Sequence, residues 1–253
     1  MEELQTIQAS QVQRSFKRKE KKYLLSGDQY EDLFSAIGNR LQEDEYSRTA
    51  VLSLYYDNSS CDLLGRSADG PVYKEKFRIR SYGVPDDTSK VFAEIKKKYD
   101  GIVYKRRVQG TYGEILDLLD GKMMPDNDIQ IQKEIIWMAD RYGLAPAAFI
   151  GYDRTAYTSP ADPGFRLTVD SDIRYRLTDL DLRKGDHGDL LREPGFRIME
   201  IKTAGSMPLW LTAILSEKKI YSGSFSKIGT CYKEIIIPGL SSDGNRYRRD
   251  KDV

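Results

Sequence analysis

Charged and apolar residues alternate along five stretches of the chain, and this pattern predicts five β-strands. Successive side chains of a strand point to opposite faces, so residues two apart share a face. The five stretches are residues 17–23, 74–82, 91–99, 166–174 and 198–202. Each stretch therefore predicts a strand with one charged face and one apolar face.

The strand predicted at 74–82 has an entirely cationic face, made of Lys74, Lys76, Arg78 and Arg80, opposite Phe77 and Ile79. The charged faces of the other predicted strands carry both positive and negative side chains. In 91–99 the charged face is Glu94, Lys96 and Lys98, and in 198–202 it is Glu200 and Lys202. In 166–174 strict alternation predicts that Leu167, Val169 and Ile173 share the apolar face.

Apolar residues at helical spacing predict four helices. Ser26 and Gln29 form a capping-box pattern before a helix whose apolar positions continue to Leu41, within an acidic stretch that extends to residue 45. Thr111 and Glu114 repeat the pattern. A third helix follows at 131–142, ended by Gly143, and a fourth opens at Ser206 and Pro208.

The helices have one apolar stripe each, which must be covered by the apolar faces of the strands. The charged faces then converge on one another, so we expect an α+β fold with a closed antiparallel β-barrel, a charged lumen and helices packed outside. No linker or repeat divides the chain. We expect a single domain at 15–240, a flexible tail at 1–14 and a flexible basic tail at 241–253.

The composition excludes several kinds of chemistry. Among 253 residues there are one histidine, His187, and two cysteines, Cys61 and Cys231, so a zinc site is nearly excluded. His187 lies between glycine-containing turn residues, which disfavours a histidine-dependent triad. Carboxylates, lysines and arginines are the remaining candidates for the chemistry.

The chain contains no apolar run of the roughly 20 residues that a membrane helix needs, and its start is not typical of a signal peptide. We therefore expect a cytoplasmic protein with reduced cysteines. The basic C-terminal tail is expected to be solvated, with contact to a protein partner or an anionic membrane surface as the alternative.

The cations are concentrated, although 40 Lys and Arg nearly balance 39 Asp and Glu overall. Residues 74–107 hold eleven Lys and Arg against five Asp and Glu. A lumen with this lining requires a polyanion, and a phosphate chain suits a narrow one better than nucleic acid does. Each of Glu20, Glu94 and Glu200 is two residues from a lysine. Each is either an internal ion-pair partner or a ligand of Mg²⁺ or Mn²⁺, and Glu200 is the strongest metal candidate.

Seven motifs occur in order between about residues 15 and 235. They are Arg18-x-Glu20-x-Lys22-Tyr23, Lys76-x-Arg78-Ile79-Arg80, Glu94-Ile95-Lys96-x-Lys98, Tyr152-x-Arg154, Arg166-x-Thr168-x-Asp170, Met199-Glu200-Ile201-Lys202 and Ser224-x-Ser226-Lys227. This series resembles the VTC-type polyphosphate polymerase domain of the triphosphate tunnel metalloenzymes. The resemblance implies an antiparallel tunnel of about eight strands.

The resemblance also implies roles for particular residues. It places Lys22, Arg78, Arg80 and Lys96 at the reacting phosphates. It implies phosphate binding by Lys105, Tyr152, Arg154, Arg166, Lys202, Ser226 and Lys227, and metal binding by Glu200 with Glu20 and Glu94. The adjacent cations Arg106 and Arg107 leave open which residue of 105–107 points inward.

One departure distinguishes branches of this superfamily. The tunnel triphosphatases carry Glu-x-Glu-x-Lys on the first strand, whereas Arg18 occupies the first of these positions here. The change favours one metal ion, Mn²⁺ or Mg²⁺, and a polymerase that transfers the terminal phosphate of ATP to polyphosphate. The alternatives are a metal-dependent triphosphatase and a non-catalytic polyphosphate-binding module.

Overall fold

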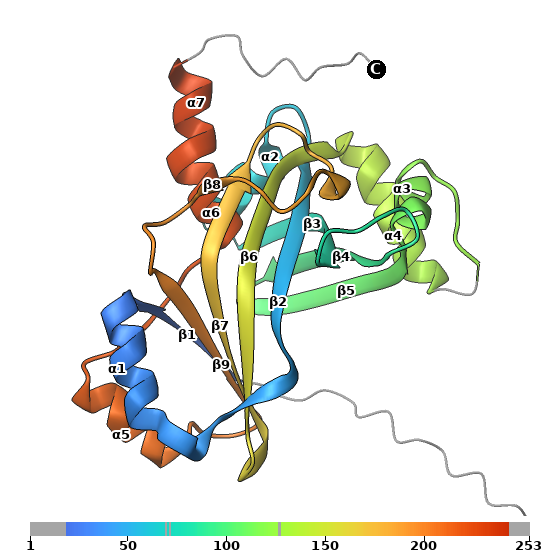
Figure 1. Cartoon of the computed structure of the whole chain (residues 1–253). Helices are drawn as coiled ribbons and strands as arrows, with labels where there is room; N and C mark the ends of the chain where they lie inside the picture. The colour runs from blue at the N-terminus through green and yellow to red at the C-terminus, as the bar shows by residue number, and fades with distance from the viewer. Residues whose placement is uncertain (1–18, 69, 71, 126–127, 243–253) are drawn as a thin grey trace, which may run out of the picture.

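A strongly bent antiparallel sheet of ten strands runs through the molecule (Figure 1). The computed structural model describes residues 19–68, 70, 72–125 and 128–242. The strands lie in the order β10 (Ser222–Gly223), β1 (Lys19–Leu25), β9 (Arg197–Thr203), β7 (Asp162–Arg176), β6 (Ala145–Ser159), β2 (Gln42–Asp57), β3 (Tyr73–Tyr82), β4 (Lys90–Tyr99) and β5 (Ile102–Thr111), and β8 (Asp189–Leu190) pairs with β7.

The expected closed barrel of about eight strands is wrong. Among the described residues, β5 and β10 are the two ends of the sheet and do not pair with each other. β10 is only two residues long, so it extends the β1 side too little to reach the opposite edge. Alternation along a strand shows which faces are polar, but it does not show which edges meet.

The helices lie on both faces of this sheet. They are α1 (Gly27–Ile37), α2 (Asp62–Ala68), α3 (Tyr112–Leu119), α4 (Ile129–Tyr142), α5 (Leu209–Glu217), α6 (Lys227–Cys231) and α7 (Ile237–Ser242), with short helical turns η1 (Gly38–Arg40), η2 (Leu182–Lys184) and η3 (Tyr232–Ile236). None of the helices in the described part of the chain is long and apolar enough to cross a membrane.

The predicted helix ends are largely confirmed. Both capping boxes are present, at the starts of α1 and α3, and the αL residue Gly143 ends α4. The first helix is shorter than predicted, because Gly38 adopts a φ of 58° after Ile37 and the strand β2 begins at Gln42. The tails predicted at 1–14 and 241–253 lie outside the described residues, apart from the backbone of Ser241 and Ser242.

The outer face of the sheet carries two apolar clusters. In one, Phe77 and Ile79 of β3 and Ile95 of β4 pack with α3 and α4. In the other, Leu167 of β7 and Met199 of β9 pack with α1 and α5. Figure 1 shows these two helix pairs at opposite ends of the sheet. Together they bury the apolar sides of the strands and leave the charged sides on the inner face.

The inner face holds a third apolar cluster beside the charged residues. Val51 and Tyr55 of β2 and Ile150 of β6 pack there with Ile228 and Cys231 of α6. This cluster fixes α6 and η3 against the inner face. The C-terminal helices therefore border the charged part of the sheet.

A bulge in β7 corrects one detail of the predicted alternation. Asp172 has a φ of 47°, and the pairing of β7 with β6 shifts between Ser171 and Arg174. After the bulge the side chains change faces, so Ile173 packs in the inner-face cluster instead of joining Leu167 on the outer face. Strict alternation over 166–174 is therefore wrong at Ile173.

Candidate functional site

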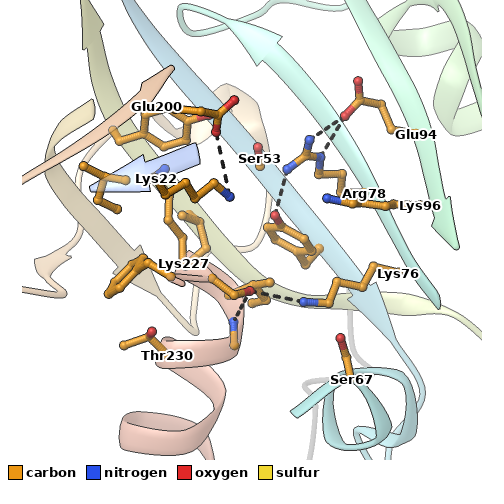
Figure 2. A pocket seen from close by; sticks show the side chains of 18 of the residues that line it. Lys22, Ser53, Ser67, Lys76, Arg78, Glu94, Lys96, Glu200, Lys227 and Thr230 are labelled. Carbon is orange, nitrogen blue, oxygen red and sulfur yellow. Dashed lines mark hydrogen bonds and ion pairs between the residues drawn. The ribbon is translucent and has the colours of Figure 1, made fainter. Parts of the chain in front are cut away.

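A cavity of about 810 Å³ lies on the inner face of the sheet. Its charged lining is mostly cationic, as the close view in Figure 2 shows. The cations are Lys22, Lys74, Lys76, Arg78, Arg80, Lys96, Lys98, Lys105, Arg154, Lys202, Lys227 and Lys233, and the anions are Glu20, Glu94, Glu200 and Glu234. We call this cavity the basic pocket. Its charged residues come from β1, β3, β4, β5, β6, β9, α6 and η3, and β2 and α2 add uncharged ones.

All but one of the residues predicted for the site line this pocket. The exception is Arg166, which is paired in register with Lys202 on the neighbouring strand but lies beyond the pocket. Its Nη2 is 3.3 Å from Oδ2 of Asp44, and its side chain is 55% exposed. The structure therefore places Arg166 beside Lys202 on the neighbouring strand but outside the lining of the pocket.

The geometry of β5 decides which residue of 105–107 enters the pocket beside Glu94. Nζ of Lys105 is 2.7 Å from Oε1 of Glu94 on the inner face. Arg106 points to the outer face, where Nη1 is 3.2 Å from Oε2 of Glu134 on α4. Lys105 therefore occupies the predicted place in the pocket.

Glu94 anchors the central arginine of the pocket. Nε and Nη2 of Arg78 donate to Oε2 of Glu94 at 2.8 and 2.7 Å, and Nε of Arg80 lies 3.9 Å from the same oxygen. Burial alone would raise the pKa of Glu94, but Arg78, Arg80 and Lys105 outweigh it and lower the pKa to about 2. Glu94 is therefore a fixed anion that orients cations on two strands.

The next row across the sheet contains three lysines and no anion. Lys76 pairs in register with Lys96, and Lys96 pairs with Lys105. Burial, with the positive charges of Lys96 and Arg78 nearby, lowers the pKa of Lys76 to about 8. Burial, with Lys22 and Arg78, also lowers the pKa of Lys96. An anionic ligand beside this row would relieve the mutual repulsion.

A buried aspartate links the sheet to α6. Oδ2 of Asp170 is 2.6 Å from Nζ of Lys227, and Oδ1 is 2.6 Å from Nε of Arg154. Burial would raise the pKa of Asp170, but Lys227 and Arg154 outweigh it and lower the pKa. The ring of Tyr152 lies beneath both cations, 4.1 Å from Nζ of Lys227 and 5.3 Å from Cζ of Arg154.

Ser226 is placed by α6, which it caps. Its Oγ accepts from the backbone N–H of Gly229 at 3.2 Å and from Nζ of Lys76 at 3.3 Å. The predicted pair Ser226 and Lys227 therefore enters the pocket from a helix that faces β3 across the cavity.

Charges alternate on the neighbouring strands β1 and β9. Glu20 pairs in register with Lys202, and Lys22 pairs with Glu200. Nζ of Lys22 is 3.6 Å from Oε1 of Glu20 and 3.8 Å from Oε2 of Glu200, while Nζ of Lys202 is 2.5 Å from Oε1 of Glu200. Burial would raise the pKa of Glu200, but Lys202 and Lys22 outweigh it and lower the pKa, which keeps its carboxylate charged.

The chemistry of these donors fits a hard divalent cation that is held jointly with phosphate. Mg²⁺ typically binds one or two carboxylates and completes its shell with water and phosphate oxygens. Glu20 and Glu200 supply two carboxylates on adjacent strands. The described residues contain no group of three or more His, Cys, Asp or Glu side chains that could hold a metal alone. Glu94 fits this role less well, because its side chain is only 3% exposed, against 13% for Glu200 and 45% for Glu20.

Several pocket residues were missed by sequence reasoning or left out of the predicted site. Lys74, Lys76 and Lys98 share faces with predicted ligands, so the alternation of β3 and β4 was sufficient to include them. Ser53 and Tyr55 were missed because β2 was not predicted. Burial would raise the pKa of Tyr55, but Arg78, Lys76 and Arg80 outweigh it and lower the pKa to about 8.

A bent antiparallel sheet that gathers lysines and arginines around one cavity has the charge and geometry suited to anions with several charges. The chain belongs to the VTC domain family, whose model matches residues 17–236. The match covers every element that lines the basic pocket.

Two solved structures resemble the chain at low sequence identity. The first is the PH1819 protein from Pyrococcus horikoshii OT3, with 14% identity and a TM-score of 0.43, covering 88% of this chain and 99% of that one. The second is HpAC1 from Hippeastrum, described as an adenylyl cyclase candidate with a dominant triphosphatase activity. Its identity is 17% and its TM-score 0.45, with 85% of this chain and 94% of that one covered.

Proposed function

We propose that this VTC-family chain is a metal-dependent polyphosphate polymerase that transfers the terminal phosphoryl group of ATP to the end of a polyphosphate chain in the basic pocket. The observation that carries the proposal is the lining of the cavity, in which twelve lysines and arginines face four glutamates. Such a lining suits a ligand with many phosphates more than one with a single anionic group.

Two buried polar atoms of the pocket support a phosphate ligand. Nε of Arg80 and Oγ of Ser53 have no hydrogen-bond partner among the described residues. The two residues are paired in register on β3 and β2. A buried polar group without a partner costs about 1–3 kcal/mol, and a phosphate oxygen between these atoms would remove that cost.

The proposed reaction needs positioning and charge neutralisation more than a general base. An anionic oxygen at the end of the polyphosphate chain attacks the γ-phosphorus of ATP, and the bond from that phosphorus to the β,γ-bridging oxygen breaks. ADP leaves with the electron pair, so no net proton transfer is required. Arg78 and Arg80 would bind the transferring phosphoryl group, and Lys22 and Lys96 its neighbours.

Glu20 and Glu200 would hold the divalent cation in this proposal. When bound, the cation neutralises negative charge on phosphate oxygens. Lys22 lies against both carboxylates and Lys202 against that of Glu200, and the two lysines would contribute their charges to the adjoining phosphates. Asp170 would keep Lys227 and Arg154 in place, with Arg154 close enough to Glu200 for their charges to interact.

Product analysis tests the proposal. The chain is incubated with ATP and Mn²⁺, and the products are separated on a gel stained for polyphosphate. Long chains with an equivalent release of ADP are expected. Orthophosphate without polymer would instead identify a triphosphatase, and tight polyphosphate binding without turnover would identify a binding module.

A pair of arginine variants locates the activity in the pocket. Arg78→Ala should abolish polymer formation, because it removes the central cation of the inner face. Arg106→Ala is the matched control, since Arg106 lies two strands away on the outer face and pairs with Glu134. Equal loss in both variants would show that the activity does not depend on the pocket.

A further inference from the structure

The hydroxyl of Tyr55 lies at the centre of the basic pocket, next to its best-anchored arginine. Tyr55 is 7% exposed and packs in the inner-face apolar cluster, so its ring is fixed. Its register partner on β3 is Arg78, whose partner on β4 is Glu94. The three side chains therefore form one row across three strands.

Arg78 is held from both sides in this row. Nη1 donates to the Tyr55 hydroxyl at 2.8 Å, and Nε and Nη2 donate to Glu94. A guanidinium group has five N–H donors, so two remain, one on each terminal nitrogen. Tyr55 and Glu94 thus fix the guanidinium and leave a pair of donors for a ligand.

The Tyr55 hydroxyl keeps its own hydrogen available. The oxygen accepts from Arg78, and no acceptor for its O–H is found among the described residues. A buried hydroxyl with an unused donor inside a cationic cavity is suited to an anionic oxygen.

We propose that Tyr55 is a further substrate-binding residue, which holds Arg78 through its oxygen and donates its hydrogen to the phosphate that Arg78 binds. This inference rests on the proposed function. It adds a neutral donor to a site whose other predicted phosphate ligands are nearly all cations.

The electrostatic setting supports this role. The lowered pKa of Tyr55, about 8, makes its hydroxyl a stronger donor than an ordinary phenol. The charged groups near it are Lys76, Arg78 and Arg80 on β3 and Glu94 and Lys96 on β4, and the other walls of the pocket carry Lys22, Glu200, Arg154 and Lys227. A bound phosphate adds negative charge and so favours the protonated phenol.

The test compares the binding of inorganic tripolyphosphate, which requires no turnover, in two variants. Tyr55→Phe removes the hydroxyl and keeps the ring, and should weaken binding roughly ten- to a hundredfold, as expected for a hydrogen bond to a charged group. Tyr56→Phe is the matched control. Tyr56 is the next residue, lies in the outer-face cluster and should leave affinity unchanged.

A spectroscopic measurement shows whether the phosphate binds beside Tyr55, which a purely structural role would not require. Near pH 8 the wild type should contain some tyrosinate, and tripolyphosphate should decrease its absorbance. This decrease should be absent in Tyr55→Phe and present in Tyr56→Phe. Wild-type affinity in Tyr55→Phe, or an unchanged absorbance decrease, would overturn the inference.

Failure of the proposed function would look different. If the wild type did not bind tripolyphosphate, both the pocket assignment and the Tyr55 contact would be rejected. If the wild type bound it and formed no polymer from ATP, the polymerase would be rejected, while the two tyrosine variants would still decide the role of Tyr55.

Discussion

The ammonium group of Lys227 on α6 lies 2.6 Å from the buried carboxylate of Asp170 on β7. Arg154 binds the same carboxylate from β6, so one anion holds two cations from different elements. The side chain of Asp170 is 2% exposed, which makes it the main electrostatic anchor between the C-terminal helices and the sheet.

Asp170→Asn should therefore destabilise the fold. Removing one partner of a buried charge network leaves the others uncompensated and costs on the order of 3 kcal/mol. Urea denaturation measures this loss as a lower free energy of unfolding. Asp117→Asn, which removes an exposed partner of Lys122, is the control and should change stability by less than about 1 kcal/mol. Equal effects would show that Asp170 does not act as an anchor.

Glu94 should make stability depend on pH in the acid range. Its pKa is about 2 in the folded protein and 4.5 without the fold, so its contribution is complete above about pH 4.5. It is lost as the pH falls toward 2, because the unfolded chain then binds the proton more readily. The difference in unfolding free energy between wild type and Glu94→Gln, on the order of 3 kcal/mol at neutral pH, should shrink across that range. A constant difference would contradict the lowered pKa.

Lys76 should make phosphate binding weaken above about pH 8. Its pKa is about 8, so the pocket loses one positive charge as the pH rises through that value. Lys76→Arg keeps the charge and should reduce the decrease in tripolyphosphate affinity between pH 7 and 9.5, leaving the part caused by Tyr55. Lys98→Arg, on the same face of the pocket, is the control and should show the wild-type decrease in affinity. Calorimetric titration at several pH values measures both.

Glu200→Gln should weaken the binding of Mn²⁺ to the tripolyphosphate complex at least tenfold, roughly the effect of losing one charge-assisted ligand. Glu200 is a proposed carboxylate ligand with hard oxygen donors, and its replacement also leaves Lys22 and Lys202 without their shared anion. Mn²⁺ titration of the complex, followed by the signal of the free ion, gives the affinity. Glu234→Gln, at the pocket edge, is the control, and equal weakening would argue against Glu200 as ligand.

The alternation of residues predicted the two faces of strands toward the ends of the sheet better than those of the central strands. In β3 one face is cationic and the other packs on α3 and α4, so alternation is visible in the residues. The central strand β2 is buried on both sides from Val51 to Asp57, and β6 is buried on both sides at its middle. Alternation disappears in such strands, and for that reason Tyr55 was missed.

Part of the site was predicted because its residues repeat at strand spacing in β1, β3, β4 and β9, whereas Lys105, Tyr152, Arg154, Ser226 and Lys227 followed from the family resemblance. Two features of the molecule depend on its three-dimensional arrangement and not on local residue order. Arg166 lies outside the lining of the pocket although its register partner Lys202 lines it, and the separation of β5 from β10 depends on which edges pair. Neither is encoded in the local order of polar and apolar residues. The bulge at Asp172 could not be predicted from the residue order either, because the residue with positive φ there is not a glycine.

The concentration of cations in one cavity has a kinetic consequence. The chain has a net charge of only +1, so the remainder of the molecule is acidic overall. At physiological salt, charges are screened beyond about 8 Å, and an approaching polyanion gains little attraction before it reaches the mouth of the cavity. Ionic strength should consequently change the rate at which a phosphate chain escapes far more than the rate at which it arrives.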